Sequence, residues 1–230
     1  MSNPILIVGR SGTGKSRSVK NFAPGEVVIL NTSGKLLPFF EPRHDVVDIP
    51  SLVRKVTKPG EAKPLKADII TSWLMNHKDE YKSVVIDDYG FALFEIYQRF
   101  RISEDERLSN KYEAFDIITN KVATLVDSLY EDGVFDRLVY IIVHEEVDQH
   151  GNIAPLVMGK MVNDKYVLEG HVTCTLQSAK VGGEYVFYTN NGNPAKSPEG
   201  LFEGETIPND LKAVDARIRE AYRWNDMATA

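Results

Sequence analysis

Short runs of apolar residues, separated by segments with a different pattern, are the first feature of this sequence. They occupy residues 5–8, 27–30, 84–86 and 138–143. Continuous runs of this kind are typical of strands that are buried on both faces, because neither side of such a strand has to be polar. Helical patterns separate the runs, so the sequence predicts an α/β fold with a mostly parallel sheet flanked by helices.

A long amphipathic helix is predicted over residues 110–132, because apolar side chains recur there every three or four positions. The apolar positions are Tyr112, Phe115, Ile118, Val122, Leu125, Val126 and Leu129. Two shorter helices are expected over residues 67–77 and directly after residues 87–88. Residues 51–66 contain Pro59, Gly60 and Pro64 and are predicted to form a loop.

The pattern changes after residue 160. Residues 166–178 and 184–189 are predicted to be strands joined through Gly182-Gly183, and residues 190–193 carry a turn signal. These strands predict an antiparallel C-terminal extension of the sheet. A last helix is expected over residues 209–224, and nothing divides the chain, so residues 1–230 are expected to form a single domain.

Composition narrows the class of protein. Hydrophobic residues make up 43% and charged residues 26% of the chain, which is ordinary for a soluble globular protein. The net charge of −6 argues against a protein that coats nucleic acid with its whole surface. No apolar run is long enough for a membrane span and no secretory signal is recognised. The single cysteine, Cys174, has no partner for an internal disulfide, so a cytoplasmic location is expected.

A complete phosphate-loop motif, GxxxxGK[ST], follows the first apolar run. It consists of Gly9, Arg10, Ser11, Gly12, Thr13, Gly14, Lys15 and Ser16. A strand that leads through such a loop into a helix points several backbone N–H groups at one place, and the helix dipole adds positive potential there. In this Walker A motif Lys15 is expected to reach the β- and γ-phosphates and Ser16 to bind Mg²⁺. The sequence therefore predicts ATP and Mg²⁺ as ligands.

Candidate catalytic residues follow two of the other predicted strands. Asp87 ends a Walker B pattern and is expected to hold Mg²⁺, directly or through water. Asp88 is either a residue that polarises the attacking water or an exposed turn residue. His144 and Glu145 follow the run at residues 138–143, at the strand end where ligands bind in doubly wound sheets. His144 is thus a candidate γ-phosphate sensor, the alternative being a histidine hydrogen-bonded at a strand-to-loop junction.

Two further segments are of interest. Residues 147–161 lack a clear period and are predicted to form a mobile loop that could report the nucleotide state. A second segment, residues 98–111, has basic and aromatic residues of the types that bind single-stranded DNA, although a solvated helix face explains them equally well. Its candidate residues, with their neighbours, are Tyr97, Arg99, Phe100, Arg101, Arg107, Lys111 and Tyr112.

Several motifs together resemble those of a known family. They are the phosphate loop, Asp87-Asp88, His144-Glu145, Gly159-Lys160-Met161, Leu168-Glu169-Gly170, residues 195–200 and residues 207–211. In these motifs the chain resembles phage P-loop nucleotide-binding proteins that are similar to the RecA-like ATPase core of phage single-strand annealing proteins. The resemblance spans nearly the whole chain, and its C-terminal motifs are the most specific.

The resemblance implies a RecA-like core that assembles head to tail into a homo-oligomer, with nucleotide between subunits. It further implies that the protein acts on single-stranded DNA in phage recombination, in the host cytoplasm, with a single-stranded DNA-binding protein as a possible partner. Lys196 matches the position from which RecA-like subunits offer a lysine to the γ-phosphate of a neighbour, a role comparable to that of an arginine finger. The alternative for Lys196 is a solvated loop lysine.

The chain departs from the RecA pattern in one place. RecA-like ATPases commonly carry a catalytic glutamate after the second strand, whereas residues 30–33 read Leu-Asn-Thr-Ser. Hydrolysis then relies on Asp88 or Glu145, or is slow or absent. A nucleotide or metabolite kinase, and a nucleotide-switched phage assembly protein without turnover, remain as alternatives. A AAA+ ATPase is disfavoured, because residues 201–230 leave little room for a helical lid domain.

Overall fold

A nine-stranded sheet forms the centre of the computed structural model, which describes residues 2–40, 43–101, 111–147, 150–157, 166–192 and 194–224. The strands are β1 (Asn3–Gly9), β2 (Val27–Asn31), β3 (Asp45–Asp48), β4 (Ser83–Asp87), β5 (Leu138–Val147), β6 (Ile153–Pro155), β7 (Cys174–Val181), β8 (Glu184–Tyr188) and β9 (Thr206–Pro208). Their order is β3-β2-β4-β5-β1-β7-β8-β9, and β6 pairs with β5 outside this path. The phosphate-loop strand β1 and the Asp87 strand β4 are therefore separated by β5.

Most of the strand pairs are parallel. The six strands from β3 to β7 in this order run in one direction, whereas β8 and β9 are antiparallel to their neighbours. The mostly parallel sheet with antiparallel C-terminal strands confirms the predicted α/β fold class. One detail of the prediction is wrong: β7 is itself parallel to β1, so the antiparallel extension begins only at β8.

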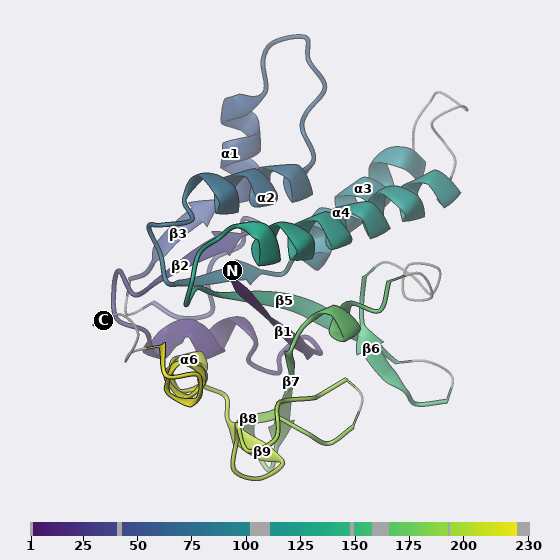
Figure 1. Cartoon of the computed structure of the whole chain (residues 1–230). Helices are drawn as coiled ribbons and strands as arrows, with labels where there is room; N and C mark the ends of the chain where they lie inside the picture. Colours follow the sequence, from purple (N-terminus) through teal and green to yellow (C-terminus); the bar gives the residue numbers. More distant parts are fainter. Residues whose placement is uncertain are drawn as a thin grey trace.

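Helices cover both faces of the sheet (Figure 1). One face carries α1 (Ile49–Val56), α2 (Lys66–Asn76), α3 (Gly90–Arg101) and α4 (Lys111–Glu131). The other face carries the 3₁₀ helix η1 (Ser16–Asn21) and α6 (Leu211–Ala221). A second 3₁₀ helix, η2 (Leu168–His171), precedes β7. The long helix and both shorter helices predicted from the apolar period are present.

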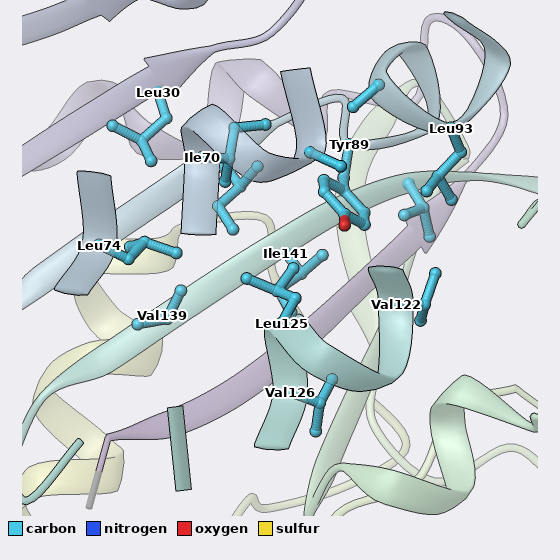
Figure 2. Packing of buried hydrophobic residues seen from close by; sticks show 14 of the residues in the cluster. Leu30, Ile70, Leu74, Tyr89, Leu93, Val122, Leu125, Val126, Val139 and Ile141 are labelled. Atoms are coloured by element: carbon cyan, nitrogen blue, oxygen red, sulfur yellow. The ribbon is translucent and has the colours of Figure 1, made fainter. Parts of the chain in front are cut away.

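Alternate residues of the central strands enter two different cores. In β1, Leu6 and Val8 belong to the core under α1–α4, whereas Ile5 and Ile7 belong to the core under η1 and α6. Figure 2 shows the first of these cores, where Leu125 and Val126 of α4 lie close to Ile141 of β5. Burying each large apolar side chain contributes about 1.5–3 kcal/mol, which explains why the strand sequences are continuously apolar.

The structure differs from the sequence prediction in two loops. Residues 51–56 belong to α1 rather than to a loop, because Asp48 caps this helix by accepting a hydrogen bond from Ser51 N at 2.7 Å. The loop predicted at residues 147–161, of which residues 148–149 and 158–161 lie outside the described residues, is not a simple loop either. β5 continues to Val147 and pairs with β6 as an antiparallel hairpin. The hairpin is formed by backbone hydrogen bonds between its two strands, and its side chains show no period from which it could be predicted.

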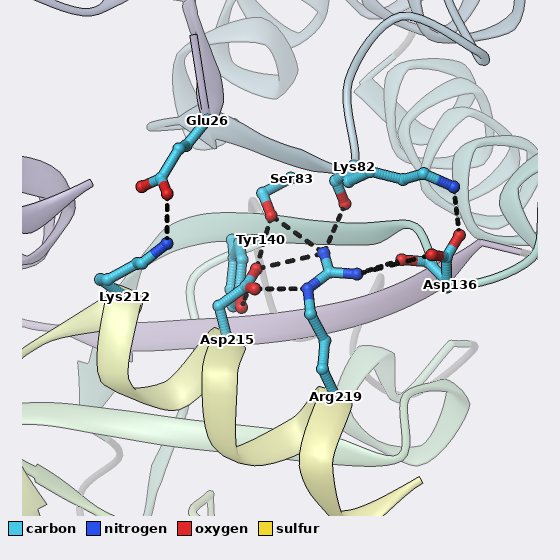
Figure 3. A network of polar contacts seen from close by, with 8 residues as sticks. All are labelled: Glu26, Lys82, Ser83, Asp136, Tyr140, Lys212, Asp215 and Arg219. Atoms are coloured by element: carbon cyan, nitrogen blue, oxygen red, sulfur yellow. Dashed lines mark hydrogen bonds and ion pairs between the residues drawn. The ribbon is translucent and has the colours of Figure 1, made fainter. Parts of the chain in front are cut away.

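A buried polar network attaches α6 to β4 and β5 near the amino-terminal ends of these strands, away from the strand ends that carry the phosphate loop (Figure 3). Asp215, 5% exposed, accepts hydrogen bonds from Ser83 Oγ at 2.5 Å and Tyr140 OH at 3.1 Å. It also forms an ion pair with Arg219, whose Nε lies 2.6 Å from Asp215 Oδ1. Because each polar group has a partner, the network fixes α6 without leaving a buried charge alone.

No helix in the described part of the chain is both long and apolar enough to cross a bilayer.

Candidate nucleotide-binding site

The backbone of the phosphate loop has a shape that only glycine fits at two positions. Gly14 has a φ of +93°, and a Cβ there would lie 2.8 Å from the Tyr185 ring. A Cβ on Gly9 would lie 2.6 Å from Ser178 O. Strands β7 and β8 therefore press closely against the loop, and the loop glycines are required by packing as well as by conformation.

Lys15 is held at the centre of the loop. Its Nζ donates hydrogen bonds to Gly9 O at 2.7 Å and Arg10 O at 2.8 Å, and lies 3.5 Å from His144 Nδ1. The residue is 7% exposed, and this burial lowers the pKa of its ammonium group, whereas the neighbouring carboxylates oppose the shift. Loss of hydration makes the ammonium group a strong electrostatic partner for an anion bound in the loop.

Ser16 and Asp87 form a pair of oxygen donors next to Lys15. Ser16 Oγ donates a hydrogen bond to Asp87 Oδ1 at 2.7 Å. Burial raises the pKa of the Asp87 carboxyl, and the hydrogen bond from Ser16 partly offsets the effect. Hydroxyl and carboxylate oxygens are the donors that Mg²⁺ prefers, and a cation there would relieve the cost of burying this carboxylate. The residues predicted to bind Mg²⁺ therefore fit the ion.

Asp88 and His144 face one another beside this pair. His144 Nε2 lies 3.3 Å from Asp88 Oδ2. Asp88 has a φ of +61°, a conformation that is uncommon for a residue other than glycine. Its Oδ1 is buried and has no hydrogen-bond partner among the described residues. An acceptor of this kind is suited to hold a water molecule, so Asp88 is more than an exposed turn residue.

Register places His144 at the loop. In the β1–β5 pair Gly9 lies opposite His144, and β5 is the strand between the phosphate loop and Asp87. The structure thus brings together Lys15, Ser16, Asp87, Asp88 and His144, as their positions at strand ends predicted.

Glu145 is engaged in a different contact. Its Oε1 lies 2.8 Å from Arg10 Nε, and its Oε2 accepts a hydrogen bond from Gln177 Nε2 at 3.1 Å. The carboxylate is 5% exposed. Because each of its two oxygens has a partner, Glu145 is placed to fix Arg10 of the loop, and its predicted catalytic role stays a prediction. Gln177 of β7 was not foreseen, because no motif links it to residues so distant in sequence.

A cavity of about 570 Å³ opens over the loop. Its wall includes residues that the sequence analysis did not single out: Arg17, Ser33, Lys35, Leu36, Pro38, Ile142 and Tyr185. The Arg17 guanidinium lies 4.9 Å from the centre of the Tyr185 ring, and Lys35 Nζ lies 4.5 Å from that of Phe91. The side chains of Lys15, Arg17 and Lys35 line the cavity together with two carboxylates, those of Asp87 and Asp88. This mixture of charges suits a polyphosphate that carries a cation.

The helix after the loop is shorter than expected. η1 is a 3₁₀ helix of six residues, with no acidic residue in its first turn. A 3₁₀ helix of this length has a poorer alignment of peptide dipoles than a long α-helix, so the predicted contribution of the helix dipole has to be reduced. Anion binding then depends mainly on the loop N–H groups and on Lys15.

Lys196 does not reach the phosphate loop of its own chain. Its backbone pairs with Thr175, which lies opposite Leu6, three residues before Gly9 in β1. Lys196 is also absent from the residues that line the cavity over the loop, and its predicted role toward a neighbouring subunit stays a prediction.

The candidate DNA-binding segment is described only in part. Arg99 donates hydrogen bonds to Lys63 O at 2.6 Å and Glu95 Oε1 at 2.7 Å. Arg107 lies outside the described residues, as do the side chains of Arg101 and Lys111 and the Gly159-Lys160-Met161 motif. Leu168-Glu169-Gly170 lies in η2.

No protein-family model matches the sequence, and no curated protein matches it either. Among solved structures, the fold is similar to that of a KaiC-like protein from the hyperthermophilic archaeon Pyrococcus horikoshii OT3. The two chains are 13% identical, with a TM-score of 0.43, and the match covers 90% of this chain and 84% of the other.

Proposed function

We propose that this chain binds Mg²⁺-ATP at the phosphate loop. The observation that carries the proposal is the Ser16–Asp87 oxygen pair, 2.7 Å apart, beside the ammonium group of Lys15. A metal-bound triphosphate needs a lysine that contacts the phosphates, and a hydroxyl and a carboxylate that hold the metal. Bound Mg²⁺ would supply positive charge between the phosphate oxygens.

The residues of the chain have separate tasks in this proposal. Lys15 and the loop N–H groups bind the phosphates, and Ser16 and Asp87 hold the metal. Asp88 orients the attacking water through its unpartnered Oδ1, and His144 keeps Asp88 in place from the adjacent strand. This chain lacks the catalytic glutamate that RecA-like ATPases commonly carry after the second strand. In the proposal, Asp88 accepts the proton from water in its place.

Binding is tested with Lys15→Ala. Calorimetric titration with Mg²⁺-ATP is expected to show affinity at least about tenfold weaker than that of the wild type, because a charged hydrogen-bond donor is lost. Lys58→Ala is the matched control, since the Lys58 side chain is 77% exposed and lies away from the cavity. Equal affinity of wild type and Lys15→Ala would contradict the site assignment.

Turnover is tested separately. Release of phosphate from ATP is expected to fall at least about tenfold in Asp88→Asn, as for the loss of a general base. Absence of phosphate release in the wild type, together with tight Mg²⁺-ATP binding, would favour a nucleotide-switched assembly protein, which the missing glutamate also suggests.

A finer proposal concerns the biological role. We propose that ATP controls self-assembly and binding to single-stranded DNA in phage recombination, with Lys196 reaching the nucleotide of a neighbouring subunit. The support for this role is the family resemblance in the C-terminal motifs. Phosphate release and particle size, measured in the same samples across a titration with single-stranded DNA, test it. Unchanged particle size and no retention on DNA at low salt would overturn this part alone.

A further inference from the structure

Asn209 of the motif at residues 207–211, one of the C-terminal motifs that carry the resemblance, lies against the phosphate loop. Asn209 stands in the short connection between β9 and α6, and it is 7% exposed. Its Oδ1 lies 3.0 Å from the position that a Cβ on Gly14 would occupy. No physical role for this motif could be assigned from sequence, and the fold places Asn209 in contact with the loop.

A chain of buried hydrogen bonds connects Asn209 to the loop. Asn209 Nδ2 donates to Ser178 Oγ at 3.0 Å, and Ser178 Oγ donates to Thr13 O at 2.6 Å. Ser178 is 1% exposed, the bond from Asn209 to it is buried, and the bond from Ser178 to Thr13 is partly buried. The backbone N–H of Asn209 donates to Tyr185 O at 3.2 Å, which fixes the asparagine to β8.

A second contact binds the same motif to the helix that follows the loop. Asp210 Oδ2 accepts a hydrogen bond from Asn21 Nδ2 at 2.7 Å, and Asp210 Oδ1 caps α6 by accepting from Lys212 N at 3.0 Å. The loop and η1 are therefore both connected to the start of α6.

The contact at Thr13 has a consequence for anion binding. A peptide unit is planar and trans, so its carbonyl and N–H point in opposite directions. Holding Thr13 O against Ser178 therefore also fixes the direction of the Gly14 N–H, which belongs to the same peptide. Such N–H groups are the donors that a phosphate loop offers to its ligand.

We propose that Asn209 and Ser178 are positioning residues that hold the phosphate loop in its nucleotide-binding conformation through the Thr13 carbonyl. The proposal rests on the proposed binding of Mg²⁺-ATP. Asn209 Oδ1 is buried without a partner among the described residues, which is unfavourable unless the side chain has another task. Presenting Nδ2 to Ser178 is that task.

The test uses Ser178→Ala, Asn209→Ala and the double variant, with Mg²⁺-ATP as the probe. Each single variant is expected to bind about fivefold more weakly than the wild type, as for the loss of one net hydrogen bond. The double variant is expected to be only as weak as the weaker single variant, because either change breaks the same chain. Ser83→Ala is the matched control, because it also removes a buried serine hydroxyl. Ser83 is 3% exposed and lies at the amino-terminal end of β4, away from the phosphate loop. This variant is expected to lower Tm without changing affinity.

A second measurement does not depend on nucleotide. Hydrogen exchange of residues 9–16 is expected to be about fivefold faster in Ser178→Ala and Asn209→Ala than in the wild type or Ser83→Ala. If Asn209→Ala does not fold, Ser178→Ala alone decides. Wild-type affinity and wild-type exchange in Ser178→Ala would overturn the proposal. If the wild type binds no Mg²⁺-ATP, the proposed function fails, and the exchange measurement still decides whether these residues hold the loop.

Discussion

Arg10 of the phosphate loop is bound to Glu145 of β5, with 2.8 Å between Arg10 Nε and Glu145 Oε1. The contact joins the loop to the strand that carries His144. It also directs the Glu145 carboxylate at the loop, while the second carboxylate oxygen accepts a hydrogen bond from Gln177.

The Arg10–Glu145 pair is expected to contribute little to stability. The Arg10 side chain is 64% exposed, so solvent screens the pair and its coupling is expected to be below about 1 kcal/mol. A double-mutant cycle of Arg10→Ala and Glu145→Gln, measured by urea unfolding, checks this value. A coupling above about 2 kcal/mol would show that the pair stabilises the fold itself.

Backbone strain at Asp88 gives a second prediction. With φ at +61°, the position favours glycine or asparagine over alanine. Asp88→Gly and Asp88→Asn are therefore expected to be about 1 kcal/mol more stable than Asp88→Ala. The free energy of unfolding of the three variants in urea measures the difference. Equal stability would mean that the site relaxes to another conformation in Asp88→Ala.

The network around Asp215 is expected to be a major contribution to stability. Asp215→Ala leaves Arg219, Ser83 and Tyr140 without their shared acceptor and is expected to cost about 3 kcal/mol. Glu220→Ala is the control, because it breaks the exposed contact of Glu220 with Arg217 on the same helix. Unfolding in urea compares the two variants, and similar values for both would contradict the importance of burial.

The single thiol offers a fourth prediction. Burial raises the pKa of Cys174 to about 12 from its ordinary value of 9.0. The folded state therefore holds the proton more tightly than the unfolded state, and this contribution to stability is lost as pH rises from about 9 to about 12.

Reaction with a thiol reagent at pH 8 is expected to be slow in the native protein and rapid in denaturant. The colour released over time measures the rate, and Cys174→Ala is the blank because the sequence has no other cysteine. Fast labelling of the folded protein would show that β7 opens locally.

Much of the fold could be predicted because each central strand is buried on both faces and is therefore continuously apolar. β3 was not predicted, because its sequence is Asp-Val-Val-Asp and its first residues are exposed. α1 was not predicted, because the prolines at the end of residues 51–66 indicated a loop. The helix begins after Asp48, which caps it. In both cases a short element depends on tertiary contacts more than on its own pattern.

The site divides in the same way. Lys15 and Ser16 come after β1, Asp87 ends β4, and His144 is the last residue of β5 that pairs with β1. These three strands are neighbours in a parallel sheet, so the approach of the four residues could be predicted from sequence. Asn209 could not be predicted in this way, and neither could the other contacts from β7 and β8. These strands reach the loop only because the chain returns to the free edge of β1 after more than a hundred residues.

Register between β1 and β5 has a consequence for how such a sequence is able to diverge. Each residue of β1 from Asn3 to Gly9 faces one residue of β5 from Leu138 to His144. Deleting one residue within β5 would exchange its two buried faces and set Glu145 where His144 now meets Lys15. The buried side chains of β5 can therefore be exchanged for other apolar ones, whereas the number of residues in this strand cannot change.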